Sequence, residues 1–92
     1  MKLEWDETKA ASNLRKHGVR FDAAVAFEFD TALIGIEDDL PYGEDRLKAY
    51  GFIGMKLHVM IYVERGETVR IISLRVASSA EKRFYEDEIT YW

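Results

Sequence analysis

TVRIISLRVASSAEKRF, the stretch over residues 68–84, joins a long apolar run to the start of a helix. Its first part is rich in β-branched and apolar side chains, which predicts a strand over residues 68–77. Ser78 is followed three residues later by Glu81, and this spacing is typical of a capping box at the start of a helix. The stretch therefore predicts that the fold ends with a strand that leads directly into a closing helix over residues 78–92.

The predicted last strand carries arginines in spite of its apolar character. Arg70 and Arg75 are five residues apart, so a regular strand sends their side chains to opposite faces. Both can serve one site only where a bulge intervenes or where the site wraps the end of the strand. One interpretation is a salt bridge at the sheet rim, with Glu64, Glu67 or an acid of the central segment. The other is phosphate binding, because a guanidinium is always charged and matches a phosphate bidentately.

Three further strands are predicted upstream of this stretch. Residues 31–37, 46–55 and 56–64 form apolar or alternating runs, and a turn around Gly66 joins the last of them to the final strand as a hairpin. Residues 1–5 alternate weakly, which fits a short strand. The predicted sheet is a meander of four antiparallel strands.

Two helices are predicted before the strands. Residues 6–18 are expected to form one helix, with Asp6 as its N-cap and Gly18 at its end. Residues 21–29 are expected to form a second, short helix capped by Asp22, with a strand as the competing interpretation. The predicted fold is α+β, with N-terminal helices and a C-terminal helix packed on a small antiparallel sheet.

Size and composition favour a single globular domain over residues 1–92. A chain of 92 residues buries enough surface for one modest core. It contains no cysteine, which excludes disulfides and thiolate metal sites. No apolar run reaches the roughly 18 residues of a membrane span, and the charged N-terminus is unlike a signal peptide. We therefore expect a cytoplasmic protein with no membrane contact.

The net charge of −4 is distributed unevenly along the chain. Residues 21–45 hold eight acids and no base, whereas residues 1–20 and 46–92 each carry a net charge of +2. This distribution leaves room for a local positive surface outside the central segment. The acids of residues 37–45 have the chemistry of magnesium ligands, but they lack a regular ligand spacing, which favours a solvated loop.

The residues that could carry out chemistry belong to few types. The sequence lacks a glycine-rich phosphate loop, a GxSxG elbow and any Cys–His pair, so catalysis would use arginine, carboxylate, histidine, lysine or tyrosine. Arg46 begins a predicted strand and Arg65 lies at the hairpin tip. Together with Arg70 and Arg75 they would form a sheet edge suited to an RNA backbone. His17 either stabilises the negative end of its helix or takes part in acid–base catalysis.

Two longer motifs relate the chain to a known family. The motif W-D-x-x-K-x-x-x-N-x-x-K-H-G-V-x-F is matched by Trp5, Asp6, Lys9, Asn13, Lys16, His17, Gly18, Val19 and Phe21. The motif R-I-I-S-x-R is matched by Arg70, Ile71, Ile72, Ser73 and Arg75. In the order and spacing of these motifs, from Glu4 to Glu86, the chain resembles the BrnT toxins of bacterial type II toxin–antitoxin systems.

The resemblance implies a RelE-like fold and a function. It implies a metal-independent ribonuclease that uses no cofactor and inhibits translation by cleaving RNA, with the RNA 2′-hydroxyl attacking the adjacent phosphate. The implied partner is a BrnA-like antitoxin with a ribbon-helix-helix domain. Operator DNA would be contacted only through that antitoxin, in a heterotetramer of two toxins and two antitoxins.

The resemblance also implies roles for individual residues. Arg75 and Arg46 would stabilise the charge that develops on the phosphate, with Arg70 as a third cation. Glu44, His17 or a lysine would transfer the proton. The further residues expected to contact RNA are Lys16, Arg65 and Arg83.

Two other functions remain open at this point. A RelE-like module that binds an antitoxin and has little or no nuclease activity fits the acidic overall charge. A metal-dependent nuclease that uses the acidic loop is the third interpretation, and EDTA would abolish its activity.

Overall fold

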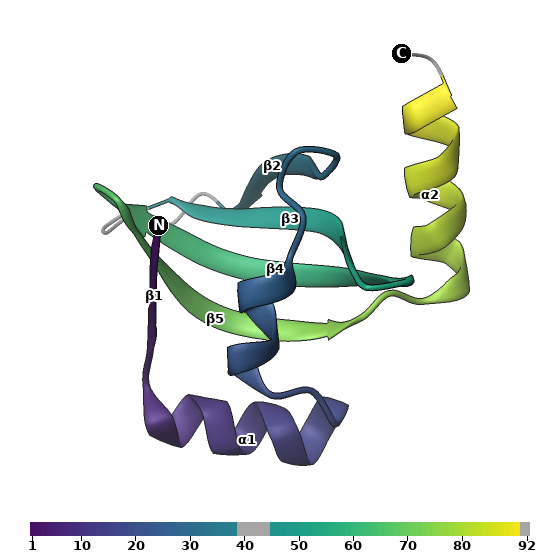
Figure 1. The fold of residues 1–92 in the computed structure, drawn as a ribbon. Coiled ribbons are helices and arrows are strands. Elements are labelled where there is room, and N and C mark those ends of the chain that lie inside the picture. Colours follow the sequence, from purple (N-terminus) through teal and green to yellow (C-terminus); the bar gives the residue numbers. More distant parts are fainter. Residues whose placement is uncertain (39–44, 91–92) are drawn as a thin grey trace.

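The computed structural model describes residues 1–38 and 45–90, and Figure 1 shows its helical segments arranged around a sheet. The five strands lie in the order β1-β5-β4-β3-β2. In chain order the elements are β1 (Lys2–Trp5), α1 (Glu7–His17), the 3₁₀ helix η1 (Phe21–Ala26), β2 (Leu33–Asp38), β3 (Arg46–Ile53), β4 (Lys56–Arg65), β5 (Thr68–Val76) and α2 (Ser79–Thr90). Most of the predicted acidic loop falls in residues 39–44, outside the described residues.

The antiparallel meander predicted from the sequence is confirmed for β2 to β5. The prediction of four strands was incomplete, because β1 pairs in parallel with β5 and makes a fifth strand. Leu3 and Trp5 of β1 pack against the core beneath the sheet. The Trp5 ring meets Phe21 edge-on, with the ring centroids 6.1 Å apart. Burial of these two side chains is the physical reason that so short a segment joins the sheet.

Helix α1 begins and ends as its sequence predicts. The Asp6 carboxylate accepts hydrogen bonds from the backbone N–H groups of Thr8 (2.7 Å) and Lys9 (3.1 Å). These hydrogen bonds, led by that from Lys9, lower the pKa of Asp6. Gly18 has a φ of 71° and donates its N–H to the Leu14 carbonyl, so it ends the helix in the left-handed conformation that glycine adopts without strain.

The second predicted helix was wrong in type and in its cap. Residues 21–26 form a 3₁₀ helix with no side-chain cap, and the Asp22 carboxylate instead pairs with Arg20 at 3.3 Å. A 3₁₀ helix has three residues per turn, so Phe21, Ala24 and Phe27 share one line and are all buried, while Val25 is 83% exposed. Burial of residues three apart therefore favoured the tighter helix.

The sheet has an apolar cluster on each of its faces. Ala49, Met60 and Leu74 are fully buried on the face covered by η1. On the other face, Leu57 and Val59 belong to a smaller cluster, to which α2 contributes one buried side chain, Tyr85. Figure 1 shows α2 standing at the end of the sheet. The predicted closing helix and its capping box are confirmed. The Ser78 N–H donates to the Glu81 carboxylate at 2.8 Å, and the Glu81 N–H donates to the Ser78 hydroxyl at 3.2 Å.

A bulge in β5 decides which face each arginine occupies. Ile61 pairs with Ser73 and Tyr62 pairs with Ile71, so Ile72 is an extra residue on β5. After this bulge the alternation of the strand is shifted by one residue. Val69, Ile71 and Leu74 therefore all contribute to one core cluster. Arg70 and Arg75 then lie together on the opposite face, which is the condition under which the sequence allowed them to serve one site.

Candidate nucleic-acid interface

A pocket of about 240 Å³ lies between α1, the bulged part of β5 and the start of β3. We call it the basic pocket. Its lining residues are Lys9, Ser12, Asn13, Lys16, His17, Arg46, Ile72 and Ser73. The pocket brings together residues that are up to 64 positions apart in the sequence, from Lys9 to Ser73.

Helix α1 supplies one wall of the basic pocket. Lys9, Ser12, Asn13 and Lys16 follow the i, i+3, i+4, i+7 spacing of a single helical face. This face is polar, whereas the residues of a helix that packs on a core are usually apolar. The spacing therefore places two lysines and a serine toward the pocket rather than toward the interior.

The Asn13 side chain fixes that wall to the sheet. Its amide donates to the Leu74 carbonyl at 2.7 Å, and its carbonyl accepts from the Leu74 N–H at 3.2 Å. The same amide group also donates to the Val19 carbonyl at 3.0 Å. The pairing of β1 with β5 ends at Ile71, so the next part of β5 is a free edge that Asn13 completes as a further strand would.

Arg46 enters the site from β3. Leu47 of β3 pairs with Tyr62 of β4, so the register places Arg46 opposite Val63. Val63 in turn pairs with Arg70 of β5, on the other side of β4. Neighbouring strands lie about 4.8 Å apart. Arg46 and Arg70 therefore begin about 10 Å apart on one face of the sheet, and the side chain of Arg46 reaches the basic pocket.

The electrostatics of the basic pocket are those of an anion site. Lys9, Lys16 and Arg46 are cations, His17 is exposed beside them, and the lining residues that the structure describes include no carboxylate. Arg46 is half-buried, and none of the side chains that the structure describes forms an ion pair with it. A guanidinium without a carboxylate partner is available to bind a phosphate.

The two arginines of β5 are held by carboxylates instead. Arg70 donates to Glu4 at 2.7 Å, and Arg75 donates bidentately to Glu81 at 2.6 and 2.7 Å. The hydrogen bond from Arg75, assisted by the backbone N–H of Ser78, lowers the pKa of Glu81 to about 2 in spite of partial burial. The same hydrogen bond raises the pKa of Arg75. The salt-bridge interpretation therefore describes both arginines, with partners other than those expected from the sequence.

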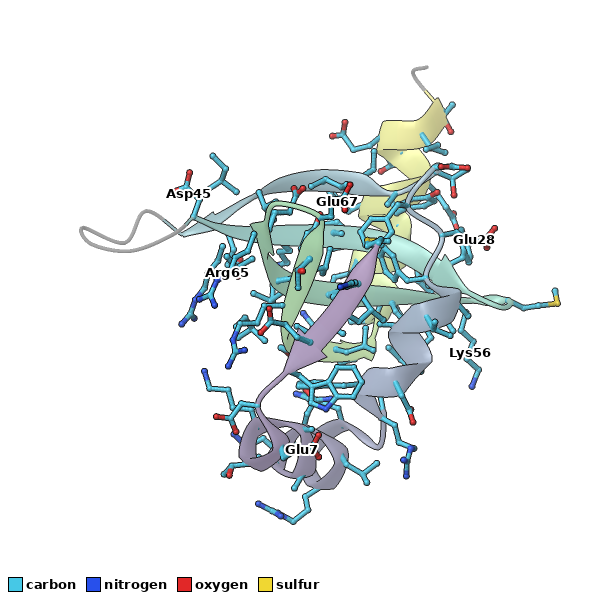
Figure 2. All side chains as sticks on the ribbon, turned by 60° about the vertical axis from the view of Figure 1, so that its left-hand side comes forward. Glu7, Glu28, Asp45, Lys56, Arg65 and Glu67 are labelled. Atoms are coloured by element: carbon cyan, nitrogen blue, oxygen red, sulfur yellow. The ribbon has the colours of Figure 1, made fainter. Side chains whose placement is uncertain are left out.

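Two of the remaining predicted residues, Arg65 and Arg83, are not among those that line the basic pocket. Arg65 is exposed at the end of β4, on the side of the molecule where Figure 2 shows Asp45. Arg83 is exposed on α2. Glu44 lies outside the described residues. The structure thus brings together Lys16, His17 and Arg46 among the residues singled out from the sequence.

Three residues on the α1 wall of the pocket were not identified as site residues from the sequence. Lys9 and Asn13 stand in the first family motif, and Ser12 stands in neither motif. The signal that would have found them is the polar helical stripe that they share with Lys16. Recognising the stripe also requires knowing that this face of α1 looks onto a sheet edge, which depends on the tertiary fold.

The described residues contain neither a cluster of metal ligands nor a membrane-spanning helix. Within residues 1–38 and 45–90, no three His, Asp or Glu side chains gather closely enough to hold a metal ion. None of the helices in those ranges combines the length and apolarity needed to cross a bilayer.

A model of one protein family matches residues 5–81, which is more than half of the 92-residue chain. The family is described as the ribonuclease toxin, BrnT, of type II toxin-antitoxin systems. The matched range contains every residue that lines the basic pocket. No curated protein matches the chain.

Proposed function

The chain belongs to the BrnT family of ribonuclease toxins of type II toxin–antitoxin systems, and we propose that it cleaves RNA at the basic pocket without a metal ion. The observation that supports this proposal is the lining of the pocket, which gathers three cations and a histidine and, within residues 1–38 and 45–90, no carboxylate. RNA is bound mainly through its phosphates. The cations of the pocket attract these phosphates, and the described lining residues add no negative charge that would repel them.

The proposed reaction is a transesterification within the RNA. The 2′-oxygen forms a bond to the adjacent phosphorus while the bond from phosphorus to the 5′-oxygen breaks. A proton leaves the 2′-hydroxyl, and another reaches the departing 5′-oxygen. His17 is the group in the pocket that we assign to proton transfer, because histidine is the side chain that most often acts as a general acid or base.

Arg46 is the cation that we assign to the developing charge on the phosphate. It comes from a strand, and strands hold catalytic groups more precisely than loops do. Lys9 and Lys16 on α1 would bind flanking phosphates as point charges. Arg70 and Arg75 remain candidates for RNA contact, but RNA would first have to compete with Glu4 and Glu81 for them.

The family implies that this protein has an antitoxin as its partner. The type of antitoxin and the form of the complex are part of our proposal. A type II toxin has a protein antitoxin. We propose that this antitoxin is BrnA-like with a ribbon-helix-helix domain, that it carries the contact with operator DNA, and that two toxins and two antitoxins form a heterotetramer. We further propose a RelE-like fold, one domain over residues 1–92, and action on RNA in the cytoplasm.

The test is RNA cleavage in EDTA by the wild type and by Arg46→Ala. Removing one preorganised donor of an anion site typically lowers the rate by about 10²–10³-fold, and we expect a loss of that size. His17→Gln should lose about 10²-fold or more if His17 transfers the proton. Lys56→Ala is the matched control, because Figure 2 shows Lys56 at the end of the molecule opposite Arg65.

Several results would contradict the proposal. Full activity of Arg46→Ala, with its fold verified by circular dichroism, would remove Arg46 from the site. Loss of wild-type activity in EDTA would favour a metal-dependent reaction.

A second function is supported by the ion pairs of β5. Both strand arginines are occupied by carboxylates, which fits a module that binds its antitoxin and has little nuclease activity. In that case the wild type would cleave neither free RNA nor RNA on translating ribosomes, while it still bound the antitoxin.

A further inference from the structure

A second pocket lies on the opposite side of β3 from the basic pocket, between the edge strand β2 and helix α2. We call it the β2–α2 groove, and its volume is about 400 Å³. Its lining residues are Leu33, Ile34, Gly35, Ile36, Lys48, Tyr50, Phe84 and Glu88. Most of these side chains are apolar, in contrast to the lining of the basic pocket.

The β2 wall of the groove is the outer edge of the sheet. β2 is last in the strand order and, among the residues that the structure describes, pairs only with β3, so no described strand pairs with the other side of its backbone. Ile34 is 49% exposed and Ile36 is 62% exposed. Proteins usually protect such an edge with charges, proline or a covering element, because it otherwise pairs with another chain. Neither a charge nor a proline interrupts β2 between Leu33 and Ile36.

The α2 wall of the groove is also exposed and apolar. α2 buries only Tyr85, and Figure 1 shows the helix rising away from the end of the sheet. Phe84 lies against the Tyr50 ring, with centroids 5.3 Å apart, yet it remains 46% exposed. Exposed aromatic side chains beside a free edge are typical anchors for a protein partner.

The charges around the groove argue against RNA as its occupant. Lys48 is the base among the lining residues, and Glu37 already pairs with it at 3.7 Å. Glu88 stands on the opposite wall. Around it, residues 84–90 of α2 contain three acids and no base. A polyanion is repelled by this rim, whereas lysine and arginine of a partner would be attracted.

A second copy of this chain would also be a poor occupant. Pairing two β2 edges would bring together two rims that each carry Glu37 and Glu88. Like charges across an interface weaken it. The antitoxin remains as the occupant that the family supplies.

We infer that the β2–α2 groove is the docking site of the antitoxin, and that an extended, basic segment of the antitoxin adds to β2 as a sixth strand. Strand addition satisfies the free backbone groups of β2. Side chains that alternate along the added strand would cover Ile34 and Ile36 on one face and Phe84 on the other. Lysine or arginine flanking the apolar positions would face Glu37 and Glu88. This inference rests on the family's need for an antitoxin and not on the nuclease chemistry.

The experiment measures how tightly this protein binds the purified protein that the neighbouring gene encodes. We expect Ile36→Lys and Phe84→Ala each to weaken its binding by roughly 10–100-fold, as removal of interface anchors commonly does. Val25→Lys is the matched control, because Val25 is an exposed aliphatic residue on η1, and it should change the affinity by less than about twofold. Glu37→Gln with Glu88→Gln should weaken binding and reduce its dependence on salt.

Folding and cleavage are measured on the same variants. All of them replace residues outside the basic pocket, so their RNA cleavage should match that of the wild type, and melting curves verify that each variant is folded. Loss of antitoxin binding in the groove variants alone would support the inference.

Other outcomes would overturn the inference. Equal affinities in all variants, an equal loss in Val25→Lys, or no binding of the wild type would each do so. A wild-type dimer that Ile36→Lys dissociates would make a second copy the occupant. If the groove variants lose antitoxin binding but the wild type does not cleave RNA, the proposed nuclease activity is refuted and the inference stands. If the wild type cleaves RNA but the groove variants bind the antitoxin as tightly as the wild type does, the inference is refuted and the nuclease activity stands.

Discussion

Helices α1 and α2 are joined to the same sheet by different forces. α1 is fixed by a buried asparagine that hydrogen-bonds a strand backbone, and it is capped at both ends. α2 buries one tyrosine and is held near its start by a half-exposed ion pair. The difference matches what each helix carries. α1 supplies the cations and histidine of the basic pocket, and α2 supplies the exposed aromatic wall of the β2–α2 groove.

The physical basis of the difference is access of water to the bonds. A hydrogen bond in a buried site has no competition from solvent, and its loss leaves polar groups without partners. An ion pair near the surface is screened and contributes little. We therefore expect α1 to be an integral part of the folded unit and α2 to be held more weakly.

The largest effect should come from Asn13→Ala. This change removes the partners of the Leu74 N–H and carbonyl, and the cost of leaving such buried groups unsatisfied is about 2–4 kcal/mol in the free energy of unfolding. Urea denaturation measures it, with Ser12→Ala as the control on the same helix. A loss below about 0.5 kcal/mol would mean that α1 is held no more firmly than α2.

A smaller effect should follow acidification. The pKa of Glu81 is about 2 in the folded protein, below its ordinary value of 4.5, so folding favours the ionised form. The stabilisation from this carboxylate is therefore complete above pH 4.5 and is lost as the pH falls toward 2. Solvent screening reduces it to about 1–2 kcal/mol.

The measurement compares the unfolding free energies of the wild type and Glu81→Gln between pH 6 and pH 2. The difference between the two proteins should shrink as the pH falls. The other carboxylates titrate in both proteins and cancel. A constant difference over the whole range would show that the Arg75–Glu81 pair contributes nothing through charge.

The ion pair itself should show a coupling energy of about 1 kcal/mol, because it is bidentate but partly exposed. Arg75→Ala, Glu81→Ala and the double variant form the thermodynamic cycle that isolates this energy. Coupling near zero would leave Tyr85 as the main attachment of α2. Coupling well above 2 kcal/mol would contradict the weaker attachment that we assign to this helix.

The smallest effect should come from Tyr85→Phe. The Tyr85 hydroxyl donates to the Thr31 carbonyl at 2.7 Å, and one such hydrogen bond contributes about 0.5–1.5 kcal/mol. The ring, which supplies the packing, stays in place. Thermal unfolding detects the change, and a much larger loss would indicate that this single bond, rather than the ring, holds α2.

The parts of the fold that the sequence predicted correctly depend on neighbouring residues. Asp6 and Gly18 bound α1 because the groups that they satisfy are within four residues of them. The Ser78–Glu81 capping box is local in the same way. The candidate site was predicted less completely. Lys16 and Arg46 were expected to contact RNA, but the sequence did not indicate that they would share one pocket.

The features that were missed depend on long-range contacts. Burial every third residue made residues 21–26 a 3₁₀ helix, and packing of Leu3 and Trp5 placed the predicted N-terminal strand in parallel beside β5. Arg70 was paired with Glu4, 66 positions away. No local pattern specifies such a partner, because pairing depends on which strands become neighbours.

The sequence by itself determined where the helices and the antiparallel strands lie along the chain, and it placed arginines in a strand that also carries the core. The tertiary structure alone decided which of these cations stay available. The bulge at Ile72 brought Arg70 and Arg75 to one face, where carboxylates from β1 and α2 bind them. Arg46 reached a pocket in which none of the described lining residues is a carboxylate. The reason is physical: side-chain types and short-range hydrogen bonds are properties of the chain, whereas the charge that surrounds a side chain exists only after distant segments have packed together.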